Sequence, residues 1–140
     1  MSVLASFSST GSTLRGSEGA LISVSVTVDA HYLEEVLDAL AQLDFPINPQ
    51  IYHDGAFQYF FEDGGTATEP VTIVEFPAYE GRLPQIRKIL QVYSFGADCL
   101  HVTAMLDGIH SESRLEPAPP GARYHSRALI KHAHMAAAAR

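Results

Sequence analysis

The stretch Leu21-Ile22-Ser23-Val24-Ser25-Val26-Thr27-Val28, which is followed by Asp29, decides the fold predicted for this chain. Apolar side chains at the even positions alternate with small polar side chains at the odd ones. Because successive side chains of a strand point to opposite faces, the stretch predicts a strand with one apolar and one polar face. Asp29 stands where a helix N-cap is expected, before a predicted helix over 30–43. The apolar stripe of that helix is Leu33, Val36, Leu37, Leu40 and Leu43.

The pattern then repeats along the chain. Extended segments are predicted over 50–53, 56–61 and 71–76, a second helix over 83–93, and a last strand over 99–106. Pro84 suits the first turn of the second helix, and Gly96 suits its end. The order strand, helix, strand, strand, helix, strand predicts an α+β fold of the ferredoxin-like, split βαβ type. We therefore expect an antiparallel four-stranded sheet with two helices on one face.

The segments outside this core differ in composition. Residues 1–20 are rich in Ser, Thr and Gly and predict a flexible arm, so the core domain is expected over 21–107. Residues 108–121 contain three prolines and predict a linker. Residues 122–140 form a basic, alanine-rich tail whose composition is compatible with a helix.

Length and charge narrow the class of protein. One hundred and forty residues suffice for one compact domain, and a formal net charge of −7 argues against general nucleic-acid binding. No apolar run is long enough to span a membrane. Cys99 is the single cysteine and excludes an internal disulfide, so we expect a cytoplasmic protein. The acidic residues lie mostly within 16–111, whereas 122–140 carries four basic residues and no acidic one.

The layout resembles the ACT domains, which are small ligand-binding regulatory domains. The resemblance covers about residues 21–107 and is carried by Val24-Ser25-Val26, by Leu33-Glu34-Glu35-Val36-Leu37-Asp38-Ala39-Leu40 and by Val71-Thr72-Ile73-Val74-Glu75. It implies effector binding where the first strand meets the first helix, which makes Asp29 and His31 candidate ligand-binding residues. The PII-like signalling proteins share this layout and have a long loop between the second and third strands, similar to residues 54–70. They bind nucleotides through a glycine-rich segment after the second helix, but Phe95-Gly96-Ala97-Asp98-Cys99 does not supply a phosphate cradle.

A second group of candidate residues surrounds the aromatic hairpin. Tyr52, Phe57 and Tyr59 belong to the densest aromatic region of the chain, next to His53 and close in the predicted fold to His101. If the hairpin folds over the polar face of the sheet, the rings wall a small-molecule pocket with His53 and His101 near its mouth. Alternatively, the rings complete the core of a dimer. Because a sheet face without covering helices often pairs with a second copy, a homodimer through this face is expected.

Other polar groups have simpler interpretations. Cys99 and His101 are two residues apart on a predicted strand, but two ligands are too few for a metal site. His125, His132 and His134 are interpreted as surface residues. The basic tail rests on the acidic body of its own or a neighbouring subunit, or is disordered. No catalytic, metal-binding or cofactor-binding residue is predicted.

Three functions remain open. The first is a non-enzymatic, small-molecule-sensing or regulatory domain that self-associates through its sheet and binds a small effector. The second is a small enzyme of the isomerase or cofactor-free monooxygenase type, which would use a histidine in a pocket. The third is a protein-interaction module whose basic tail docks an acidic partner.

Overall fold

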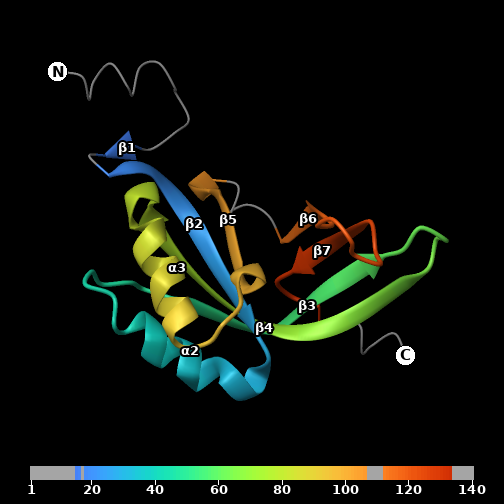
Figure 1. Ribbon diagram of the computed structural model, residues 1–140, viewed down its shortest axis with the longest axis horizontal. Helices are drawn as coiled ribbons and strands as arrows, with labels where there is room; N and C mark the ends of the chain where they lie inside the picture. Colours follow the sequence, from blue (N-terminus) through green and yellow to red (C-terminus); the bar gives the residue numbers. More distant parts are fainter. Residues whose placement is uncertain (1–14, 17, 107–111, 134–140) are drawn as a thin grey trace.

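The computed structural model describes residues 15–16, 18–106 and 112–133 and contains seven strands (Figure 1). The strands are β1 (Arg15–Gly16), β2 (Gly19–Val28), β3 (Gln50–Phe60), β4 (Thr66–Tyr79), β5 (Leu100–Ala104), β6 (Ser113–Pro117) and β7 (Ser126–Ile130). The α-helices are α2 (Leu33–Leu40) and α3 (Leu83–Val92). Short 3-10 turns are η1 (Ala30–Tyr32), η2 (Glu80–Arg82) and η3 (Ala97–Cys99).

Strand β2 lies inside the sheet, with β4 along one edge and β5 along the other. Its alternating sequence sends one set of side chains towards α2 and α3, where the main apolar core forms. That core includes Val24, Val26, Val36, Leu40, Val74, Phe76, Ile86 and Leu90, all of which are buried. Both helices therefore pack on the same face of β2 and β4.

The expected ferredoxin-like sandwich with a four-stranded sheet is wrong. Apart from the short β1, six antiparallel strands follow one another in the order β5-β2-β4-β3-β7-β6 and curl into a half-barrel (Figure 1). The two additional strands come from residues expected to form a linker and a tail compatible with a helix. Pairing of β7 along β3 is what extends the sheet, because the outer edge of β3 offers free backbone donors and acceptors.

The extended segments predicted over 50–53 and 56–61 form one strand, β3, interrupted by a β-bulge. Pairing with β4 shifts between Tyr52, which lies opposite Ile73, and Gly55, which lies opposite Val71. The His53-Asp54 pair thus opposes a single residue of β4, so the interval between the two predicted segments is a bulge within one strand. Because of this extra residue, the side chains that point to a given face are even-numbered before the bulge and odd-numbered after it. Tyr52, Phe57 and Tyr59 consequently share the face of the sheet opposite the helices.

The end of α3 also differs from the prediction. Ser94, rather than Gly96, adopts the left-handed conformation, with φ of 68°. The backbone N–H of Phe95 donates to the carbonyl of Leu90 at 2.9 Å, and that of Ser94 donates to Gln91 at 2.9 Å. These two bonds form a Schellman motif, which turns the chain sharply and places Phe95 next to Leu90.

Candidate functional site

The concave face of the half-barrel, opposite the helices, carries a row of polar side chains. At the level of Ser25 in β2, the neighbouring strands place His101 on one side and Glu75 on the other, with Gln50 beyond Glu75. Ser23, Ser25, Thr27 and His101 are all buried. A dimer is therefore not needed to cover these side chains, although the oligomeric state stays a prediction.

The β6–β7 hairpin covers one end of this row through Glu116. A carboxylate oxygen of Glu116 lies 2.7 Å from Nδ1 of His101, while Nε2 of His101 lies 3.1 Å from the hydroxyl of Thr27. Arg114 and Arg127 donate to the same carboxylate at 2.8 and 3.1 Å. Strands β5 and β6 are thus joined by side chains, since the described strands show no backbone pairing between them.

The hydrogen bonds on Glu116 set its protonation. Burial alone would raise the pKa of this carboxyl, but the bonds from His101, Arg114 and Arg127 outweigh burial and lower the pKa to about 2. Both ring nitrogens of His101 are engaged by neighbours, and the ring is buried. Such a histidine is well placed to hold β6 against β5 but has no nitrogen directed at a substrate.

A cavity of about 340 Å³ opens at the other end of the row. It is lined by Ser23, Asn48, Gln50, Tyr52, Glu75, Phe76, Pro77, Met105 and Lys131. The ammonium of Lys131 donates to Glu75 at 3.1 Å, and the other carboxylate oxygen of Glu75 accepts from the hydroxyl of Ser25 at 3.2 Å. The side chains of Glu75 and Lys131 are each only 13% exposed. The cavity wall thus contains a largely desolvated ion pair.

Tyr52 closes one side of the same cavity. Its hydroxyl donates to Gln50 at 2.9 Å, the Lys131 ammonium lies 5.3 Å from its ring centre, and the His132 ring centre lies 5.2 Å away. Partial burial raises the pKa of the Tyr52 hydroxyl, and the Glu75 carboxylate adds to this effect. Tyr52 therefore stays a neutral donor at physiological pH.

The candidate residues Asp29, His31 and His53 do not line the cavity of the concave face. Asp29 caps η1 and pairs with His31 at 2.7 Å, but both side chains are largely exposed and line none of the described cavities. The hydrogen bonds from His31 lower the pKa of Asp29. His53 is exposed on the bulge. The predicted mouth of His53 and His101 therefore does not form.

Phe57 and Tyr59 contact side chains of the β6–β7 hairpin. The guanidinium of Arg127 lies 3.9 Å from the ring centre of Phe57, and Phe57 packs with Ile73 and Leu129 in a second buried cluster. Tyr59 packs edge-on against Tyr124, with ring centres 4.8 Å apart. The aromatic residues thus fill the concave face from within one chain.

Cys99 and His101 lie on opposite sides of the sheet. Cys99 ends η3 and packs against the helix-side core, whereas His101 belongs to the concave face. Burial raises the pKa of the Cys99 thiol to about 11, and the nearby carboxylate of Asp98 acts in the same direction. Among the described residues, no group of three or more His, Cys, Asp or Glu side chains could hold a metal ion.

Sequence reasoning missed Glu75, Glu116 and Lys131 as site residues. Lys131 lies within the predicted tail and Glu116 within the predicted linker, so the sequence alone does not place either beside the core. The one available signal was charge complementarity, because an acidic body and a basic tail attract each other. Within the described part of the predicted tail, residues 122–133, Lys131 pairs with Glu75 in the body of the same chain.

Comparison of the chain with family models, with curated proteins and with solved structures finds no match. None of the helices in the described parts of the chain has the length and apolarity needed to cross a membrane.

Proposed function

We propose that this protein binds a small polar molecule in the cavity of the concave face and serves as a ligand-binding or sensing domain. The observation that carries the proposal is the Glu75–Lys131 pair in the wall of a cavity of about 340 Å³. That volume lies within the range of small-molecule sites, roughly 300–1,000 Å³. A desolvated ion pair adds little net stability, so its presence in a cavity wall favours a role in binding.

The lining side chains define the chemistry of the ligand. Glu75 accepts hydrogen bonds, Lys131 donates them, and the amides of Asn48 and Gln50 do both. A ligand that fits carries a donor group, such as an amine, and an acceptor group, such as a carboxylate or carbonyl, only a few atoms apart. The two ends of such a ligand would pair with Glu75 and Lys131, respectively.

A thermal-shift screen tests this function directly. Amino acids, nucleotides, divalent metals and flavins would be added to the protein, since a ligand at a hundred times its Kd stabilises the folded state by about 2.7 kcal/mol. We expect a compound with both donor and acceptor groups to raise Tm of the wild type and of Glu69→Gln, an exposed carboxylate away from the cavity. The same compound should fail with Glu75→Gln.

Two outcomes would contradict the proposal. One is that no compound of this class raises Tm, and the other is that Glu75→Gln responds like Glu69→Gln. An isomerase or monooxygenase built on His101 receives no support from the geometry, because Thr27 and Glu116 occupy both of its ring nitrogens.

A further inference from the structure

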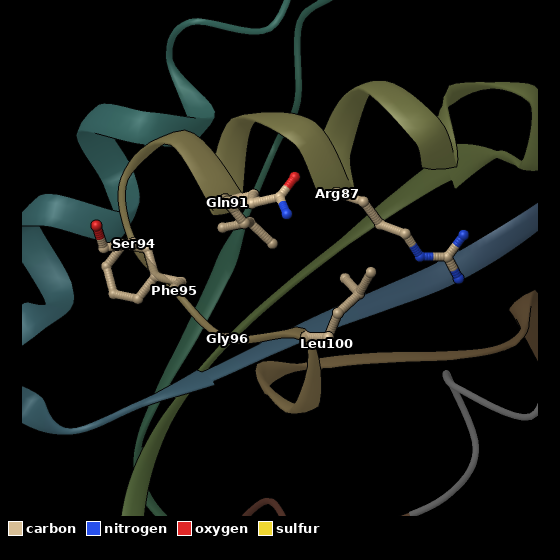
Figure 2. A pocket seen from close by; sticks show the side chains of 8 residues that line it. Arg87, Gln91, Ser94, Phe95, Gly96 and Leu100 are labelled. Atoms are coloured by element: carbon tan, nitrogen blue, oxygen red, sulfur yellow. The ribbon is translucent and has the colours of Figure 1, made fainter.

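A second cavity, of about 450 Å³, lies on the other side of the sheet, between α3 and the start of β5 (Figure 2). Among the residues that line it, the apolar Leu90, Phe95 and Leu100 are buried or half-buried, whereas the polar Arg87, Gln91 and Ser94 are exposed. Leu100 points towards α3, and Arg87 leaves α3 on the same side. The cavity is therefore a groove with an apolar floor and a polar rim.

The Schellman motif at the end of α3 builds the floor. The bond from the Phe95 N–H to the Leu90 carbonyl returns the chain against the helix, so the apolar side chains at these two positions meet. Leu90 is buried, whereas Phe95 and Leu100 are half-buried. An apolar surface of this kind that stays partly open to solvent favours an apolar ligand.

Arg87 supplies the only positive charge among the side chains that line the groove. Within residues 15–16, 18–106 and 112–133, its guanidinium forms no ion pair and no hydrogen bond. Arg87 and Gln91 are four residues apart, so they lie on the same face of α3 about one turn from each other. A carboxylate at this rim can accept hydrogen bonds from both side chains.

The dipole of α3 favours one orientation of a charged ligand in the groove. The carbonyl end of α3 lies near Ser94 and carries partial negative charge, which repels an anion. A carboxylate is therefore favoured at Arg87, one to two turns before that end, with its apolar part over Phe95 and Leu100.

We propose that this groove binds an amphiphilic carboxylate of the fatty-acid type, with the carboxylate at Arg87 and the hydrocarbon chain on Leu90, Phe95 and Leu100. The site is distinct from the cavity of the concave face and does not depend on the function proposed for it.

Octanoate is the probe for the charged end, and octanol is its uncharged counterpart. Binding would be followed by NMR titration of the full-length protein, with Kd taken from the shifts of backbone amides. Arg87→Gln removes the proposed anchor, and Lys88→Gln removes a neighbouring exposed charge on α3 that does not line the groove. Because an exposed ion pair contributes up to about 1 kcal/mol, we expect Arg87→Gln to weaken octanoate binding roughly fivefold and Lys88→Gln less than twofold. Octanol should bind both variants equally.

A groove-filling variant tests the apolar end. Ala97 is exposed and lines the groove, so Ala97→Leu should keep the fold and weaken octanoate and octanol alike. The proposal would be overturned if the amide shifts mapped outside residues 87–100, or if Arg87→Gln and Lys88→Gln weakened octanoate equally. Unchanged binding of both probes by Ala97→Leu would also overturn it.

Discussion

At the scale of single residues, the backbone of β3 requires a residue without a side chain at position 55. Gly55 follows the bulge in β3, where the opposite strand approaches closely. A Cβ atom at this position would lie 2.7 Å from Cδ1 of Ile73 and 3.1 Å from the carbonyl oxygen of Val71. Ile73 is buried and has little room to move, so only glycine fits without a shift.

We expect Gly55→Ala to lower the free energy of unfolding by about 1–3 kcal/mol, because the added methyl group overpacks the concave face. Urea unfolding monitored by circular dichroism would measure the loss. Ile73→Val removes Cδ1, the atom nearest to the added Cβ, so Gly55→Ala should cost less in that background than in the wild type. Strictly additive losses would show that the two side chains do not collide.

Ser94 adopts a left-handed backbone conformation, which costs a residue with a Cβ about 1–2 kcal/mol. Ser94→Gly should relieve this strain and, after the greater entropy of glycine in the unfolded chain is subtracted, stabilise the protein by about 0.5 kcal/mol. Ser94→Ala is the matched control, since alanine keeps the Cβ and the strain. A Tm of Ser94→Gly at or below that of Ser94→Ala would rule out this account.

At the scale of elements, the β6–β7 hairpin is held in two ways. Strand β7 pairs with β3 by backbone hydrogen bonds, and β6 contacts β5 through the side chains around Glu116. Two arginines and one histidine satisfy a carboxylate that is only 16% exposed. This cluster therefore links β6 to β5, the two end strands of the curled sheet.

The Glu116 cluster makes the stability of the protein sensitive to acid. Since its pKa is lowered to about 2, the ionised carboxylate stabilises the folded state above the ordinary value of 4.5. This contribution, about 1–2 kcal/mol after solvent screening, is lost as the pH falls from about 4.5 to 2. Glu116→Gln should therefore unfold more easily than the wild type at pH 7, and the difference should shrink towards pH 2.

Chemical denaturation at several pH values would measure this difference, with Glu69→Gln as an exposed control. A gap between Glu116→Gln and the wild type that stayed constant from pH 7 to pH 2 would contradict a stabilising role for the charged carboxylate.

At the scale of the whole molecule, each of the two faces of the sheet has its own apolar cluster and its own cavity. The helix side holds the main core and the groove at Arg87, while the concave side holds the second cluster and the cavity at Glu75. Residues 112–133 complete only the concave side. Removing them should expose Phe57, Ile73 and the polar row while leaving the helix-side core covered.

A chain that ends at Leu106 should therefore be less stable than the full-length chain by several kcal/mol, since Leu129 alone contributes about 2 kcal/mol of burial. A chain that ends at Ala133 is the control, because it retains β6, β7 and Lys131. Urea midpoints of the three proteins would be compared. Equal midpoints for the chain ending at Leu106 and the control would mean that the hairpin does not stabilise the fold.

The sequence by itself determined the elements that rest on local periodicity. The alternation over 21–28 specified β2 and its two faces, and the stripes of α2 and α3 specified which side of each helix is buried, because side-chain direction follows directly from backbone period. It also indicated that a basic tail and an acidic body would attract each other.

Only the tertiary structure decided the architecture and the site. The bulge at His53-Asp54 reverses the alternation of β3, and a one-residue shift moves Phe57 and Tyr59 to the other face. Strand β7 becomes a strand by pairing with β3 across more than 60 positions of sequence, a contact that local composition does not encode, and β6 in turn pairs with β7. The same pairing brings Lys131 to Glu75 and Glu116 to His101, so the candidate site exists only in the folded half-barrel.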